Sequence, residues 1–134
     1  MNQNRIFRLN QYDFSSGAIV YWMSRDQRIE DNWALIFAQE LALRHKQPLI
    51  IVFTLVNNFL NASVRQFAFM LKSLENESKK SYSLNIPFVL LKGNPYEEIL
   101  NFIENIKGGA LVSDFDPLKI KIEWKNKVNQ KLKI

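Results

Sequence analysis

The sequence predicts an α/β fold, a doubly wound parallel sheet with helices on both faces, in three α-β-α layers. Four short apolar segments alternate along the chain with four segments of helical periodicity. The connections between the apolar segments are long enough for the helical crossovers that parallel strands require. The 134 residues suit one domain with one core, and 47% hydrophobic against 23% charged residues is typical of a folded globular chain.

Each predicted strand is a short apolar run between turn residues. Residues 1–17 are polar and end at Ser15-Ser16-Gly17, so we expect a lead-in before a domain of residues 18–134. The run at 48–55 is continuous and rich in β-branched and aromatic residues, as a buried parallel strand requires. The other predicted strands span residues 18–23, 87–91 and 110–114.

Apolar spacing predicts the first two helices. The first spans residues 33–46, and Asn61 is a suitable N-cap for the second, which ends among the charged and polar residues 75–83. The stripe of the first helix consists of Trp33, Phe37 and Leu41, with alanines beside them. The stripe of the second consists of Val64, Phe67, Leu71 and Leu74.

The third helix is predicted from Pro95, which suits a first helical turn, to Lys107, and Gly108-Gly109 stops it. The fourth helix runs from Pro117 toward the end of the chain. Its stripe consists of Ile120, Trp124, Val128 and Leu132. We expect the three tryptophans, Trp22, Trp33 and Trp124, to pack in the core.

Composition excludes several kinds of functional site. The chain has no cysteine, and therefore no disulfide, thiolate metal ligand or thiol nucleophile. The single histidine, His45, ends a predicted helix beside two cations, where a protonated or exposed ring is expected rather than a catalytic one. No glycine-rich phosphate motif is present. The sequence has neither a signal peptide nor an apolar span of roughly 20 residues, so we expect a cytoplasmic protein without a membrane partner.

The net charge of +5 comes from the end of the chain, because residues 119–134 contain six lysines and one glutamate. Two interpretations stay open. The lysines can lie on the solvated faces of a surface helix, or they can form an electrostatic footprint for nucleic acid. In either case we expect at most weak, nonspecific DNA binding by this helix, because phosphate contacts do not read sequence.

In an open parallel sheet, ligands bind beyond the carboxyl ends of the strands, where the strand order reverses. Polar residues follow the first strand (Ser24, Arg25, Asp26) and the fourth strand (Asp114, Asp116), and together they can hydrogen-bond a polar heterocycle. In the alternative interpretation, the charged residues after the first strand pair with each other and cap the first helix. Those residues are Arg25, Asp26, Arg28, Glu30 and Asp31.

The segment VYWMSRDQRIEDNWAL at residues 20–35 resembles the opening of class II DNA photolyases, which repair cyclobutane pyrimidine dimers. Other photolyases and cryptochromes carry a looser version of this string. The likeness covers about residues 18–128, in the right order. It continues through FTLV at 53–56, RQFAFML at 65–71, IPFVLLKG at 86–93, SDFDPL at 113–118 and WK at 124–125.

The resemblance implies a Rossmann-like N-terminal domain with five parallel strands, followed by a helical domain that holds FAD and the DNA lesion. We expect the fifth strand and the helical domain to lie outside these 134 residues. The chain is then a fragment or truncated product without catalytic or metal-binding residues, and it is not catalytic by itself. Its implied partners are the FAD-binding helical domain and, through the full-length enzyme, damaged DNA.

The resemblance also implies an antenna site in this domain, where a deazaflavin or folate chromophore can bind and pass excitation to FAD. The residues that match this site are Ser24, Arg25, Asp26, Phe53, Thr54, Arg65, Asp114 and Asp116. Two alternatives stay open: a stand-alone α/β module for a nucleotide-like or deazaflavin-like ligand, and a purely structural partner domain. An open sheet edge further predicts self-association or marginal stability of the isolated domain.

Overall fold

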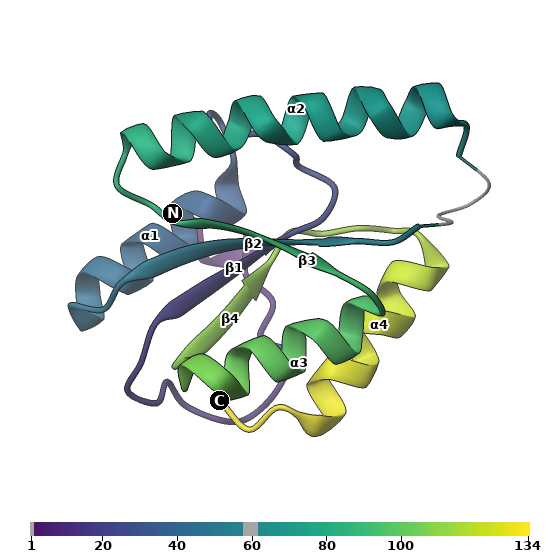
Figure 1. The fold of residues 1–134 in the computed structure, drawn as a ribbon. Helices are drawn as coiled ribbons and strands as arrows, with labels where there is room; N and C mark the ends of the chain where they lie inside the picture. The colour runs from purple at the N-terminus through teal and green to yellow at the C-terminus, as the bar shows by residue number, and fades with distance from the viewer. Residues whose placement is uncertain (1, 58–61) are drawn as a thin grey trace.

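The computed structural model describes residues 2–57 and 62–134, which contain one four-stranded sheet with all neighbouring strands parallel (Figure 1). The strands are β1 (Ile19–Met23), β2 (Leu49–Leu55), β3 (Phe88–Lys92) and β4 (Ala110–Ser113). Their order is β3-β2-β1-β4, so the chain builds outward from β1 to β3 and then returns to the other side of β1. The predicted doubly wound sheet is confirmed, and its strand order reverses between β1 and β4.

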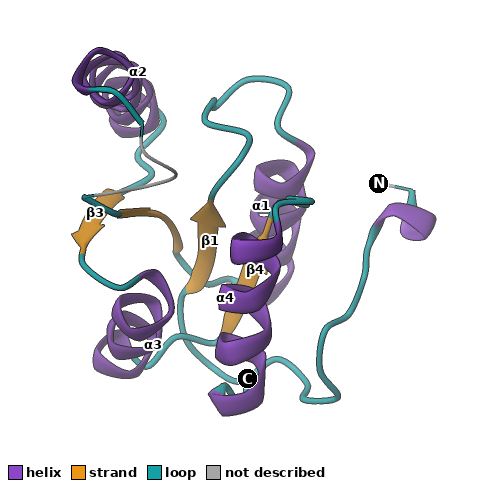
Figure 2. Cartoon of the chain, turned by 90° about the vertical axis from the view of Figure 1, so that its right-hand side faces the viewer, coloured by secondary structure: helices purple, strands orange, loops and turns teal. Residues whose placement is uncertain are grey.

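Two helices cover each face of the sheet (Figures 1 and 2). On one face lie α1 (Trp33–His45) and α2 (Val64–Ser83), and on the other lie α3 (Pro95–Ile106) and α4 (Lys119–Lys131). A short 3-10 helix, η1 (Gln3–Arg5), precedes them. The three predicted layers are therefore present.

The central strand β1 separates two hydrophobic cores, because successive side chains of a strand point to opposite faces. Tyr21 and Met23 pack toward α1 and α2, whereas Val20 and Trp22 pack toward α3 and α4. All five residues of β1 are buried, as expected for a strand covered on both faces. This strand carries the first part of the predicted site at its carboxyl end.

The prediction that Trp33 packs in the core is wrong, because its side chain is 56% exposed. Its ring lies beneath the guanidinium of Arg5, 5.7 Å from the ring centroid. Instead, α1 buries Leu35, Ala38 and Ala42 against the sheet. The helix is apolar around much of its circumference, so residue spacing alone does not select its inward face.

Helix α2 begins at a capping box, in which Ser63 Oγ accepts from Gln66 N at 3.2 Å and Gln66 Oε1 accepts from Ser63 N at 2.9 Å. The predicted cap, Asn61, lies outside the described residues. The helix runs to Ser83, the last residue of the polar stretch 75–83 in which its end was predicted. Within this stretch, Glu77 and Ser81 are buried on its inward face and hydrogen-bonded there.

The N-terminal residues cross the end of the sheet where β4 begins. Ser15 N donates to Gly109 O at 3.2 Å, and the Phe14 ring stacks on His45, with 3.9 Å between centroids. A Cβ atom on Gly109 would lie 2.3 Å from Ser15 O, so only glycine permits this close crossing. Among the described residues, no helix is both long and apolar enough to span a membrane.

Candidate functional site

Asp114, the residue after β4, organises the point where the strand order reverses. Its Oδ2 atom accepts hydrogen bonds from three successive backbone N–H groups after β1: Ser24 at 3.3 Å, Arg25 at 2.7 Å and Asp26 at 2.7 Å. Asp114 is only 6% exposed, and its second oxygen, Oδ1, is buried without a hydrogen-bond partner in the described structure. The carboxylate therefore joins β4 to the loop after β1 and keeps one acceptor unused.

Two lysines of α4 reach the same place. Lys121 Nζ donates to Ser24 Oγ at 2.9 Å, and Lys125 Nζ donates to the main-chain oxygen of Asp114. Ser24 Oγ in turn donates to Asp116 Oδ2 at 3.3 Å. We call the seven residues at this edge the switch-point cluster. They are Ser24, Arg25, Asp26, Asp114, Asp116, Lys121 and Lys125.

Burial perturbs the ionisable groups of the cluster. It raises the pKa of Asp114, although the three backbone N–H groups and the charge of Lys125 oppose this shift. Burial also lowers the pKa of Lys121 and of Lys125, against the opposing effect of the two aspartates. Perturbed ionisable groups gathered at a strand end are a common feature of functional sites.

The interpretation of these lysines as solvated surface charges is wrong for Lys121 and Lys125. Both are half-buried and hydrogen-bonded within the cluster. A third lysine, Lys127, lies 4.6 Å from the centroid of the Tyr96 ring. Of the predicted apolar stripe, Trp124, Val128 and Leu132 pack with the core of that face, whereas Ile120 is half-buried outside it.

The β1–α1 loop, residues 24–32, is held at its far end by Asn32. The Asn32 side chain caps α1 through Oδ1, which accepts from Leu35 N at 3.0 Å. Its Nδ2 donates to Tyr21 OH at 2.9 Å and to the main-chain oxygens of Asp26 and Arg28 at 3.0 Å. Asn32 was not among the predicted site residues.

The alternative pairing of the loop charges occurs only in part. Arg28 lies 3.7 Å from Asp26, but Glu30 pairs with Lys80 of α2 at 3.0 Å. The cap of α1 is Asn32 rather than one of the charged residues. The loop is also hydrogen-bonded to Asp114 and Asp116 after β4 and to Glu77 and Lys80 of α2, and Arg25 stays exposed.

The structure brings five of the eight predicted site residues together in the switch-point cluster: Ser24, Arg25, Asp26, Asp114 and Asp116. Phe53 and Thr54 lie beside it at the end of β2, where Phe53 is buried in the core and Thr54 Oγ1 accepts from Trp22 Nε1 at 3.1 Å. Arg65 lies on the exposed first turn of α2, and no interaction among the described residues links it to the cluster.

Known proteins with similar sequences show the family to which the chain belongs. The sequence profile described as DNA photolyase matches residues 19–134. The chain belongs to the DNA photolyase family. It is 44% identical over 117 residues to a deoxyribodipyrimidine photo-lyase of Potorous tridactylus and 49% identical over 107 residues to one of Arabidopsis thaliana. These matches cover 87% and 80% of the chain, but only 22% of each relative.

A more distant relative, the deoxyribodipyrimidine photo-lyase of Methanothermobacter thermautotrophicus, is 32% identical over 92% of this chain and 28% of its own length. Among solved structures, a universal stress protein from Archaeoglobus fulgidus superposes with a TM-score of 0.58 at 16% identity, covering 87% of this chain and 93% of its own. A universal stress protein in complex with cAMP gives 0.54 at 17% identity, with 89% and 93% coverage. These structures show that the photolyase-family chain has a widespread α/β fold.

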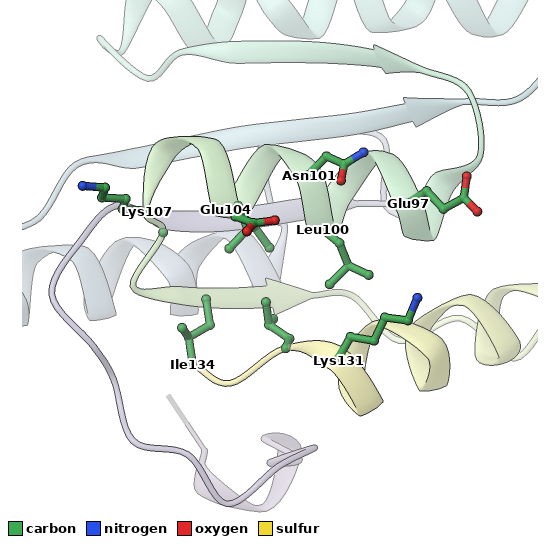
Figure 3. A pocket seen from close by; sticks show the side chains of 10 residues that line it. Glu97, Leu100, Asn101, Glu104, Lys107, Lys131 and Ile134 are labelled. Carbon is green, nitrogen blue, oxygen red and sulfur yellow. The ribbon is translucent and has the colours of Figure 1, made fainter.

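Two of the surface hollows that the described residues form lie outside the switch-point cluster of this photolyase-family domain. The larger, about 650 Å³, runs between α3 and the C-terminal residues, and Figure 3 shows Glu97, Leu100, Glu104 and Lys131 around it. The smaller, about 430 Å³, lies at the carboxyl ends of β2 and β3. Its lining residues are Val56, Asn57, Gly93, Asn94, Pro95 and Trp124. None of the eight predicted site residues lines either hollow.

Proposed function

We propose that this chain is the N-terminal domain, residues 18–134 after a lead-in, of a class II DNA photolyase. We further propose that the switch-point cluster holds a light-harvesting antenna chromophore. The family assignment and the photo-lyase relatives support the first part, and the YWMSRDQR string at 21–28 supports the class. On this proposal the domain serves light-driven repair of pyrimidine dimers by an FAD-containing helical domain, its partner in the longer enzyme.

One observation carries the antenna proposal: the buried Oδ1 atom of Asp114 has no donor among the described residues. A buried carboxylate oxygen is normally hydrogen-bonded, so an unused one at a ligand-binding edge suits a donor from a ligand. Deazaflavins and folates both carry a ring N–H beside a carbonyl group. The ring N–H suits Asp114 Oδ1, and the exposed Arg25 side chain suits the carbonyl.

The apolar surface at this edge comes from Phe115, which is not one of the eight predicted site residues. Phe115, between the two aspartates, is 76% exposed, whereas Phe53 is 4% exposed within the core. A flat ring system needs an apolar wall as well as a few polar groups. When bound, such a chromophore absorbs light and transfers the excitation energy to the flavin of the full enzyme.

The test is a fluorescence titration of the chain with a deazaflavin and, separately, with a folate. Asp114→Asn keeps an oxygen for the three backbone N–H groups but can place an amide donor where Oδ1 accepts. We therefore expect saturable binding of one chromophore by the wild-type chain and about tenfold or greater weakening in Asp114→Asn. Arg25→Ala is expected to weaken binding as well.

Glu104→Gln is the matched control, because this exposed acid lies on α3 beside the larger hollow (Figure 3). It should leave the affinity unchanged. Equal affinity of the wild-type chain and Asp114→Asn would contradict the placement of the site. Failure of the wild-type chain to bind either chromophore would contradict the antenna proposal and favour a structural partner domain.

We also propose that DNA is contacted mainly through the full-length enzyme rather than by α4. With Lys121 and Lys125 hydrogen-bonded in the cluster, fewer lysines are available for phosphates than the sequence suggests. We expect weak binding of duplex DNA that falls steeply as salt increases, with no preference for damaged sites. A gel-shift series over salt concentration measures this, and tight binding that persists at high salt would contradict it.

A further inference from the structure

Glu77, in the second half of α2, makes a contact that neither the sequence patterns nor the proposed chromophore site accounts for. Glu77 is 8% exposed, and its Oε2 accepts from the backbone N–H of Ile29 in the β1–α1 loop at 2.7 Å. Oε1 accepts from Lys80 Nζ at 2.9 Å, and the same ammonium donates to Glu30 Oε2 at 3.0 Å. The Glu77 carboxylate is thus hydrogen-bonded both to the loop and to Lys80, which also donates a hydrogen bond to the loop residue Glu30.

A buried carboxylate is unfavourable unless hydrogen bonds compensate for its lost hydration. Packing of α2 against the sheet gives no reason for a charge here, because its neighbour on the inward face, Leu74, packs there as an ordinary apolar residue. The backbone donor of Ile29 and the ammonium of Lys80 supply the compensation. The burial of the Glu77 carboxylate is therefore explained by its hydrogen bond to the β1–α1 loop.

The β1–α1 loop carries Ser24, Arg25 and Asp26 of the switch-point cluster, and hydrogen bonds to three side chains fix it at its start, middle and end. Asp114 holds the first three N–H groups, Asn32 holds the far end, and Glu77 holds the segment between them. Of these three side chains, Asp114 follows β4 and Asn32 precedes α1, whereas Glu77 belongs to α2. Glu77 therefore links α2 to the backbone of the loop, and Lys80 adds a side-chain contact from α2 to Glu30.

We infer that Glu77 is a positioning residue for the switch-point cluster. It fixes the conformation of the β1–α1 loop, and with it the direction in which Arg25 and Asp26 present their side chains to a ligand. The consequence for ligand affinity rests on the proposed antenna function, whereas the effect on the loop does not.

The experiment measures amide hydrogen exchange by NMR on the full chain, together with urea unfolding and the chromophore titration. Glu77→Ala removes the acceptor, and we expect about tenfold faster exchange at Ile29 and faster exchange at Arg25 and Asp26. The chromophore affinity should fall by a similar factor. Glu77→Gln keeps an acceptor oxygen, so it should restore most of the protection and provides a second readout if the alanine variant folds poorly.

Glu75→Ala is the matched control on the same helix. Glu75 is exposed and pairs with Lys79 of α2 at 2.7 Å, without a described contact to the loop. It should leave both loop exchange and affinity unchanged. The inference is overturned if Glu77→Ala leaves exchange at Ile29 unaltered, or if Glu75→Ala accelerates it equally.

Faster loop exchange in Glu77→Ala with undiminished chromophore affinity would also overturn the positioning role. If the wild-type chain binds no chromophore, the antenna proposal fails, and the exchange at Ile29, Arg25 and Asp26 in the Glu77 variants still decides whether Glu77 fixes the loop.

Discussion

Replacing Asp114 with alanine is expected to lower the free energy of unfolding by about 2–4 kcal/mol. The substitution removes the acceptor shared by the backbone N–H groups of Ser24, Arg25 and Asp26, and it detaches the loop from β4. A loss of this size is a large fraction of the roughly 5–15 kcal/mol by which domains are stable. Urea unfolding followed by tryptophan fluorescence measures it.

Asp114→Asn is the control that separates the shape of this residue from its charge. The asparagine oxygen can still accept from the loop, so the variant should be much more stable than Asp114→Ala. Similar losses in the two variants would contradict the role of the carboxylate as an acceptor for backbone groups.

Comparing the wild-type chain with Asp114→Asn also tests how the stability of the fold depends on pH. Because burial raises the pKa of Asp114 above its ordinary 3.8, the folded state holds this proton more tightly than the unfolded chain. The contribution of Asp114 to stability is therefore largest below pH 3.8 and falls as pH rises through the raised pKa. We expect wild type to lose stability relative to Asp114→Asn over that interval, and a gain would contradict the direction of the shift.

The second large effect is expected at Asn32, whose side chain is fully buried. Asn32→Ala removes the cap of α1 and leaves Tyr21 OH and the main-chain oxygen of Arg28 without this amide donor. We expect a loss of about 2–4 kcal/mol in the free energy of unfolding. Thermal and urea unfolding of the purified variant provide the measurement.

A matched control exists at the start of α3. Asn94 occupies the same N-cap position there, but its side chain makes no capping hydrogen bond. Asn94→Ala should therefore change stability by no more than about 0.5 kcal/mol. Equal losses at Asn32 and Asn94 would show that the amide contacts of Asn32 contribute little.

The order of elements and the parallel sheet were predictable because continuous apolar runs alternate with helical spacing. The inward face of α1 was not, because its sequence is apolar on several sides and the small Ala38 and Ala42, rather than Trp33, contact the sheet. The burial of the polar Glu77 on α2 was not predictable either, because its backbone partner, Ile29, lies 48 residues away in sequence.

The location of the candidate site was predictable from one rule, since ligands bind at the carboxyl strand ends where the strand order reverses. That rule brings Arg25 and Asp114 together. It does not indicate that the chain's own backbone already occupies one oxygen of Asp114, nor that Lys121 turns inward. In sequence, an inward lysine and a solvated lysine of a basic helix look alike.

Amide NMR during a deazaflavin or folate titration tests most directly whether a chromophore binds at the switch-point cluster. We expect the largest shift changes at Arg25, Asp26 and Phe115, with saturation at the same concentration as the fluorescence change. Shift changes confined to Leu100, Lys131 and Ile134 around the larger hollow, with the β1–α1 loop unaffected, would show that the chromophore does not bind at the switch-point cluster.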